Sequence, residues 1–555
     1  MRRSSHRATI AATLSLGIAA SLATLAFPAG AHEGEEDGYR GNERLGKVEF
    51  PVACNLKAQV EFNRGMALFH SFWFKPAIQS FSEVLSHDPS CAMAQWGIAF
   101  MSLGNPFAWP ANPQAVEGAA AAAAEAERIG AKTQRERDYI AALSVYFRNR
   151  DSEPHRARAV ALQKAFESLA ARYPDDDEAQ ILHALLLDAT ALPTDKSFAN
   201  QTRAAAILEP LLRKHPDHPG VAHYLIHTYD YAELAERGLP SARVYADIAP
   251  SVPHALHMPS HIYSRVGLWS EMVEGNRRSY LAAKAELDPA NSLGVGTYDA
   301  LHAMDYMAFG ELQQARDEEA GKIVREAASL QKVNVENFPA AYAFAAIPSR
   351  YALERRDWQQ AAALKLSPSG LAWEKFPQAE SVLVFSRGLG AARLGNPGQA
   401  RQDLKRLEEL KAAMVAAKVT YWPSQTEYQI RVVSAWIALA EKQPEQALKL
   451  MREAADMEDA SDKHPVTPGN VVPSRLLLGE MLLELKKPAA ALAELKRSLA
   501  RDPNRYQTIA AAARAAREAG DAKAARAYYA DLVRLGENAQ ARRPELAEAR
   551  DFLRQ

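Results

Sequence analysis

The chain has 555 residues, of which 48% are apolar and 24% are charged, and its 66 Lys and Arg residues are balanced by 67 Asp and Glu residues. This composition is that of a soluble globular protein. A formal charge of -1 leaves no basic surplus for binding phosphates along a groove, so nucleic acid is excluded as an expected partner.

The N-terminus has the features of an export signal. Arg2 and Arg3 precede an apolar run from Ala8 to Phe27, which is followed by Ala29-Gly30-Ala31, the small-x-small pattern that signal peptidase cleaves. We therefore expect residues 1–31 to be a signal peptide for Sec export and the mature protein to be periplasmic.

The next segment, residues 32–53, is predicted to be a flexible polar leader, because the stretch from His32 to Lys47 is polar and rich in glycine. No later segment contains 18 uninterrupted apolar residues. We therefore expect no transmembrane segment.

The chain has two cysteines, Cys54 and Cys91, and both belong to the exported part. An even number of cysteines in an oxidising compartment favours a disulfide over two free thiols. The repeat described next places them at the outer ends of one helical hairpin, so we expect a bond between them.

Small residues recur at fixed offsets along the chain. Gly65 and Gly479 are each followed by an alanine at +12, by a large apolar residue at +16 and by a proline at +24: Ala77, Phe81 and Pro89 in the first set, and Ala491, Leu495 and Pro503 in the second. Adding 34 residues to the second set gives Ala525 and Tyr529, so the period itself recurs. The pattern indicates a unit of two helices that cross at small residues.

A 34-residue helical hairpin with these features resembles the tetratricopeptide repeat (TPR). The resemblance implies an all-α, right-handed superhelical solenoid of about twelve hairpins over residues 54–555, with long loops near 287–297 and 461–473. Strand signals are almost absent, since apolar residues recur at helical spacing.

Two pairs of histidines follow the same period. His223 and His227 are four residues apart, as are His257 and His261, and the pairs are separated by 34 residues. Residues four apart share a helix face, and equivalent helices of adjacent repeats lie side by side. The four imidazoles should therefore face one small region. Pro259, between the second pair, is tolerated only in a first helical turn or at a kink.

The TPR resemblance implies that these positions line a concave groove where ligands bind. His254, Asp230 and Arg265 fall at nearby positions of the same two helices, and His302 extends the row after one period and an 11-residue insertion. The loop at His464 either folds over this groove or is a rigid connector.

Four segments resemble a group of exported bacterial TPR proteins: residues 91–100, 223–230, 255–269 and 463–469. Those relatives are named for their repeats, so the resemblance implies a fold and not an activity.

The first functional hypothesis is an exported binding or scaffold protein that recognises a protein or peptide in its groove and requires no cofactor. The predicted groove residues are His223, His227, Asp230, His254, His257, His261, Arg265 and His302.

The alternative is a transition-metal site that uses His223, His227, His257 and His261 for one ion, with Asp230 as an oxygen ligand. Imidazole suits Zn, Cu and Ni, and i, i+4 histidine pairs can converge on one ion.

A third hypothesis is a hydrolase in which a histidine acts as general base and Arg265 or Tyr263 gives electrostatic support. The sequence contains no HExxH, GxSxG, GxxxxGK[ST], CxxC or Rossmann glycine motif. We therefore expect no catalytic residues of a familiar type, and an enzyme is the less favoured class.

Overall fold

The computed structural model describes residues 43–192, 194–288, 292–540 and 543–555. Arg44–Gln555 forms one compact unit that is built almost entirely of helices, which confirms the all-α class. The predicted signal peptide lies outside the described residues. In the described ranges, every helix is too short or too polar to cross a membrane.

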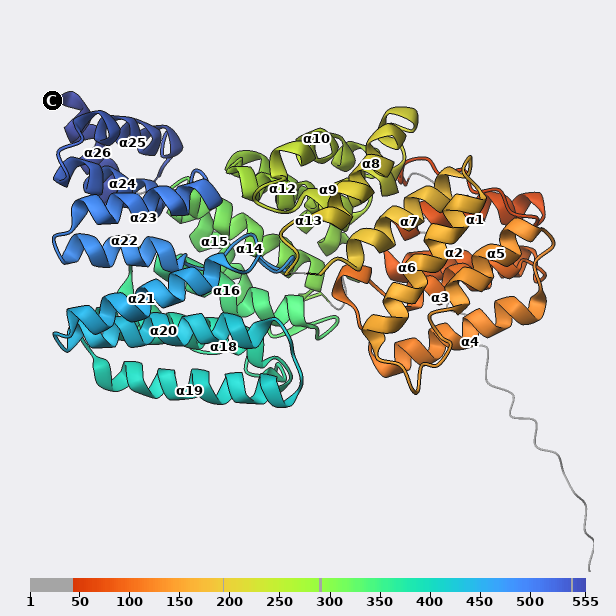
Figure 1. Cartoon of the computed structure of the whole chain (residues 1–555), viewed down its shortest axis with the longest axis horizontal. Helices are drawn as coiled ribbons and strands as arrows, with labels where there is room; N and C mark the ends of the chain where they lie inside the picture. Colours follow the sequence, from red (N-terminus) through yellow and green to blue (C-terminus); the bar gives the residue numbers. More distant parts are fainter. Residues whose placement is uncertain (1–42, 193, 289–291, 541–542) are drawn as a thin grey trace, which may run out of the picture. The chain divides into compact units, whose positions relative to one another are not determined.

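Consecutive helices pack in pairs (Figure 1). The first six hairpins are α1 (Leu56–His70) with α2 (Phe74–His87), α3 (Ala92–Ser102) with α4 (Pro113–Ile129), α5 (Gln134–Ser144) with α6 (His155–Arg172), α7 (Asp177–Ala189) with α8 (Ala199–Lys214), α9 (Pro219–Tyr229) with α10 (Leu239–Ile248), and α11 (Pro253–His257) and α12 (Pro259–Val266) with α13 (Trp269–Ala285). Short 3-10 turns, η1 (Pro106–Ala108) and η2 (Ala235–Gly238), lie in their connections.

The second six hairpins are α14 (Tyr298–Gln313) with α15 (Asp317–Ser329), α16 (Phe338–Glu354) with α17 (Trp358–Ala362), α18 (Pro377–Arg393) with α19 (Pro397–Ala416), α20 (Trp422–Ala440) with α21 (Pro444–Asp459), α22 (Ser474–Glu484) with α23 (Pro488–Arg501), and α24 (Tyr506–Glu518) with α25 (Ala522–Leu535). The 3-10 turn η4 (Trp373–Lys375) precedes α18, and α26 (Pro544–Arg554) ends the chain. These described helices make twelve hairpins, as the repeat period predicted.

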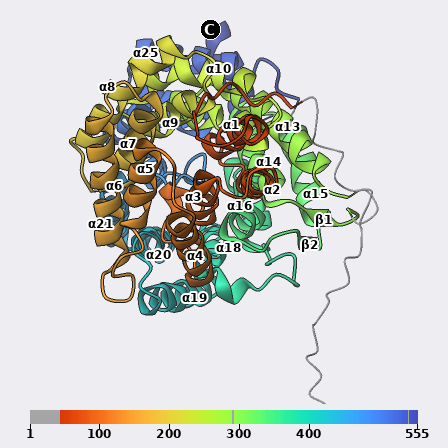
Figure 2. The same ribbon diagram turned by 90° about the vertical axis from the view of Figure 1, so that its right-hand side faces the viewer.

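The described strands are two residues each. β1 (Val295–Gly296) pairs in parallel with β2 (Lys332–Val333) at the end of the long loop near residues 287–297 (Figure 2). They join the connections on either side of the seventh hairpin and leave the helical class unchanged.

The small residues of the repeat permit close helix crossing. A Cβ atom at Gly65 would lie 2.8 Å from the ring of Phe81, and one at Gly479 would lie 2.5 Å from Leu495. In both hairpins the contact joins the +0 and +16 positions of the sequence pattern. Any larger residue at either glycine would push the two helices apart.

The described part of the predicted leader is not free. Leu45, Val48 and Phe50 are buried, and the backbone N–H of Lys47 donates to the carbonyl of Asp217 at 2.9 Å. The ring of Phe50 packs edge-on against Phe62, with centroids 5.4 Å apart. The flexible-leader expectation is therefore wrong for residues 44–53, because the apolar side chains of this stretch outweigh its polar average.

The buried apolar side chains form two clusters. One extends from Leu45 to Phe309 and the other from Leu301 to Ala549. Helix α14 contributes to both clusters. Within the first cluster, α1 also contacts α9, eight helices later in the chain, so the N-terminal hairpins curl back on themselves.

Cys54 and Cys91 form the predicted disulfide, with Cα atoms 5.4 Å apart. Cys54 precedes α1 and Cys91 precedes α3, so the bond closes the first hairpin. Replacing both cysteines by serine should lower the free energy of unfolding by about 3 to 4 kcal/mol, because the unfolded chain regains the entropy of a loop of 37 residues. Denaturant unfolding of the variant and the wild type would measure this. Wild-type protein kept in reductant should show the same loss, and equal midpoints for all three samples would contradict the prediction.

Candidate metal centre

The six histidines of interest lie in the first halves of three consecutive hairpins. His223 and His227 lie on α9, His254 and His257 on α11, His261 on α12 and His302 on α14. Helix α9 begins with Pro219 in its first turn, and the side chain of His218 accepts a hydrogen bond from the N–H of Val221. Thr297 caps α14 in the same way. These caps fix where α9 and α14 begin.

Pro259 occupies the first position of α12, one of the two places predicted for it. The residue before it, Met258, keeps helical dihedral angles, and its N–H donates to the carbonyl of His254 at 2.9 Å. The helical path therefore continues from α11 into α12, although Pro259 donates no hydrogen bond. His257 and His261 still share one face.

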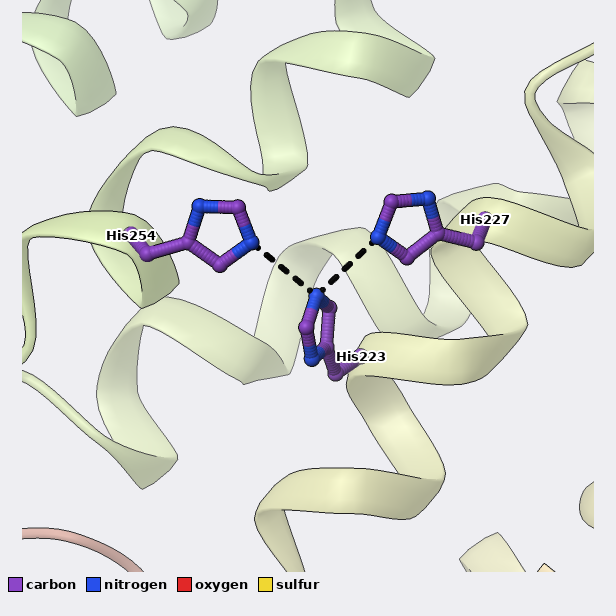
Figure 3. Close-up of side chains that lie close together, drawn as sticks. All are labelled: His223, His227 and His254. Atoms are coloured by element: carbon purple, nitrogen blue, oxygen red, sulfur yellow. Dashed lines mark hydrogen bonds between the residues drawn. The ribbon is translucent and has the colours of Figure 1, made fainter. Parts of the chain in front are cut away.

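Three histidines form a first group, which we call triad A: His223, His227 and His254. Their Nε2 atoms turn toward one another (Figure 3). The Nε2 atom of His223 lies 3.1 Å from that of His227 and 3.2 Å from that of His254. Two ligands of a tetrahedral ion with metal–nitrogen distances near 2.0 to 2.1 Å are separated by about 3.3 to 3.4 Å, so triad A is close to the size of a metal ligand set.

Three further histidines form triad B: His257, His261 and His302. The Nε2 atoms of His257 and His261 are 3.1 Å apart, and the rings of His257 and His302 have centroids 4.4 Å apart. In each triad, one nitrogen from every ring lies within 4.8 Å of the other two.

The two triads are neighbours. The ring centroids of His227 and His261 are 6.2 Å apart, and those of His254 and His257 are 6.3 Å apart. The sequence prediction that these imidazoles face one region is confirmed. The four predicted ligands fall into two groups, because each i, i+4 pair has its own third histidine: His254 for the first and His302 for the second.

The hydrogen bonds of triad B leave no proton between its two closest nitrogens. The Nδ1 atom of His257 lies 2.7 Å from the side-chain oxygen of Asn276, whose amide nitrogen donates to the carbonyl of Met272. The Nδ1 atom of His261 lies 2.9 Å from a carboxylate oxygen of Asp230. Both Nδ1 atoms must therefore carry the proton, and two Nε2 lone pairs face each other.

Triad A also has too few protons for its facing nitrogen atoms. The Nδ1 atom of His223 donates to the backbone carbonyl of His70 at 2.6 Å, so its Nε2 atom has only a lone pair. One neighbour can donate to this lone pair, but His227 and His254 both approach it. A cation bound among the three Nε2 atoms would satisfy all of them.

A third group of metal-ligating type, His70, Glu178 and His218, is complete without an ion. The Nε2 atoms of His70 and His218 each lie beside a different oxygen of Glu178, at 2.9 and 3.0 Å, and both can donate to it. The hydroxyl of Tyr224 lies 2.9 Å from the Nδ1 atom of His70. We therefore assign this group a structural role: it holds the His70 carbonyl that binds His223.

Burial keeps the imidazoles of both triads uncharged. It lowers the pKa of all six rings, and in five of them neighbouring imidazoles add to the effect. The pKa of His257 falls to about 3. Neutral imidazole is the form that binds metal ions.

Asp230 lies behind His261 and not among the Nε2 atoms. Its carboxylate accepts from His261, from Arg265 at 2.8 Å and from Lys463 at 2.8 Å. Burial alone would raise the pKa of Asp230, but Lys463, Arg265 and His261 outweigh it and hold the pKa well below the usual range. Asp230, Arg265 and Lys463 therefore form a charge network that orients His261, whereas the predicted roles of Asp230 as a metal ligand and of Arg265 in catalysis stay predictions.

Four of the six histidines are buried, and His254 and His302 are partly buried. His223 is 0% exposed and His227 is 8% exposed. Phe107, from η1, stacks on His227 with centroids 4.0 Å apart, and Phe72 packs on His223 at 4.5 Å. The hydroxyl of Tyr263, proposed above as a catalytic support, donates instead to the carbonyl of Ala242.

The long loop at residues 461–473 folds over the site, one of the two arrangements expected for it. Two buried arginines hold it in place. Arg350, paired with Asp305 at 2.7 Å, donates to the carbonyl of Gly469 and to Thr467. Arg505 donates to the carbonyls of Asn470 and Val471. Lys463 is thereby fixed beside Asp230.

Several residues of the site were not predicted from the sequence: Phe72, Phe107, Asn276 and Lys463. None belongs to the histidine period: Asn276 lies on the second helix of the hairpin that carries His257, and the other three reach the site from connections elsewhere in the chain. One signal was present, since the segment around Lys463 is a long insertion rich in proline and glycine in an otherwise regular array.

No family model and no curated protein matches the chain. Similar solved structures include the human IFIT1 dimer with PPP-AAAA, at 13% identity over 87% of this chain and 96% of that chain, with a TM-score of 0.36. The APC/C hetero-tetramer Cut9–Hcn1 is similar over 87% of this chain and 79% of that chain, at 13% identity and a TM-score of 0.33. Similarity at this level gives no information about a ligand.

The contact between α1 and α9 depends on Gly220. A Cβ atom at this position would lie 2.4 Å from the Nδ1 atom of His70, whose ring is held by Glu178 and Tyr224. Gly220→Ala should therefore lower the free energy of unfolding by about 1 to 3 kcal/mol.

Gly118→Ala on α4 is the matched control, because a Cβ atom there meets nothing within 4 Å. It should be neutral or stabilising by up to about 1 kcal/mol. Thermal unfolding followed by circular dichroism measures both variants. Equal stability of Gly220→Ala and the wild type would show that the His70 ring is not fixed.

Proposed function

We propose that the chain is a metal-binding protein whose buried centre takes two transition-metal ions, one in triad A and one in triad B. The observation that carries the proposal is the pair of facing nitrogens in triad B. His257 and His261 present lone pairs 3.1 Å apart, and both rings are fixed in this orientation by acceptors on their other nitrogen. Such an arrangement is unfavourable when empty and favourable around a cation.

The chemistry of the ligands limits the choice of metal. Six imidazoles without a carboxylate or thiolate suit zinc, copper and nickel better than magnesium or calcium, which prefer oxygen. The oxygen acceptors on Nδ1 of His223, His257 and His261 are the outer contacts typical of metal-binding histidines.

The other two hypotheses receive less support at this site. A peptide could reach His223 and His227 only by displacing Phe72 and Phe107, which pack on their rings, whereas His254 and His302 are partly buried. A histidine acting as general base needs a free nitrogen beside a substrate, whereas the Nε2 atoms of five of the six rings lie beside other imidazoles. The coarser expectation, a helical-repeat scaffold that holds a ligand, agrees with the fold.

Protein produced in metal-replete medium should contain two ions of zinc, copper or nickel per chain, measured by elemental analysis. His223→Ala should retain only the ion of triad B, and His257→Ala only that of triad A. Each loss reflects the removal of one of three ligands, which leaves a site too weak to survive dialysis.

His87→Ala, at the exposed end of α2 and outside the three groups, is the control and should still carry two ions. Circular dichroism must show helical content close to that of the wild type in all variants. A wild-type protein that folds without stoichiometric metal, and takes none up after purification, would refute the proposal.

We also propose that the protein is exported to an oxidising compartment. The sequence features of residues 1–31 and the disulfide between Cys54 and Cys91 support this. Mass spectrometry of protein recovered from the periplasm of an expressing bacterium should find His32 as the first residue. An intact Met1 in protein confined to the cytoplasm would contradict it.

A further inference from the structure

The ligand set of the proposed centre carries no negative charge. All six donors are imidazole nitrogens, so neither triad neutralises the ion that it holds. Each triad also supplies only three ligands, and three protein ligands leave one coordination position open on an ion such as zinc.

The charges around the two triads do not compensate the ions. Asp230 is already matched by Arg265 and Lys463, and Asp305 is matched by Arg350. Asp299, one turn before His302 on α14, hydrogen-bonds Tyr298 and is the remaining carboxyl group near triad B on that helix. Even with Asp299 ionised, two divalent ions would leave a large positive charge in a buried site, which is costly unless an anion joins it.

Lys463 is a buried cation beside triad B. Its side chain is 6% exposed, and its ammonium group lies 2.8 Å from Asp230, which in turn binds His261 of triad B. A cation at this point favours a negative ligand at the open positions.

The walls of the site favour a small ligand. Phe72 and Phe107 contribute apolar rings. Tyr306, whose ring lies 4.6 Å from that of His257, uses its hydroxyl to donate to the carbonyl of Pro465. These side chains would therefore select a ligand by its size and not by a pattern of hydrogen bonds.

We propose that the two-ion centre takes a small anion as its exogenous ligand, at the open positions of the ions, and that Lys463 attracts this anion. The inference rests on the proposed function, since it concerns the same centre after metal has bound. The chemical class is a compact monovalent anion with a nitrogen or oxygen donor, such as azide, formate or hydroxide.

The test uses the mature chain reconstituted with cobalt(II), whose visible absorption reports its ligands, and azide as the probe. Azide should change the cobalt spectrum of the wild type with saturation. Lys463→Met should weaken azide binding about tenfold or more, because the site loses one buried positive charge. Lys463→Arg retains the charge and should stay within about threefold of the wild type.

Lys496→Met, on the exposed side of α23, is the matched control and should not change azide binding. Cobalt content is measured in every sample. Two cobalt ions per chain with no spectral response to azide would overturn the anion proposal and leave the metal centre standing. Equal azide affinity in Lys463→Met and the wild type would overturn the role of Lys463. Failure to bind cobalt, zinc, copper or nickel would instead overturn the proposed function.

Discussion

Two unprotonated imidazole nitrogens repel each other at hydrogen-bond distance, and this constraint governs the interpretation of the whole site. In triad B the Nε2 atoms of His257 and His261 are 3.1 Å apart, and the Nδ1 atoms of these rings donate their protons to Asn276 and Asp230. The buried network of Asp230, Arg265 and Lys463 prevents His261 from turning away. A local arrangement that is unfavourable by itself, and is held by many contacts, is often part of a protein's function.

The fold brings these groups together through two kinds of contact. The repeat places equivalent faces of α9, α11 with α12, and α14 beside one another, which aligns the histidines. Contacts over long sequence distances then enclose them: α1 packs on α9, and the loop after α21 reaches back to Asp230. A repeat array that exposes its inner surface offers a groove, whereas this one covers His223 and His227 with aromatic side chains of its own.

The sequence was sufficient for everything that depends on the period. The twelve hairpins, the close crossings at Gly65 and Gly479, the disulfide and the convergence of His223, His227, His257 and His261 follow from spacing and residue type. Spacing could not show that Asp230 turns to the outer side of His261, because that depends on Lys463, 233 residues away. For the same reason it could not show that Phe72 and Phe107, which come from other hairpins, pack on His223 and His227. The prediction for residues 44–53 was wrong because it relied on the average polarity of the stretch, whereas three buried side chains decide where the stretch packs.

Helix α14 belongs to both apolar clusters of the molecule and carries His302. The ion of triad B, held between α14 and the pair α11 and α12, would therefore lie at the seam between the two clusters and join them. Separation of the clusters and release of this ion would then be coupled. A cell starved of the metal would contain a chain that comes apart more readily at this seam, and the abundance of the protein would track the supply of the ion.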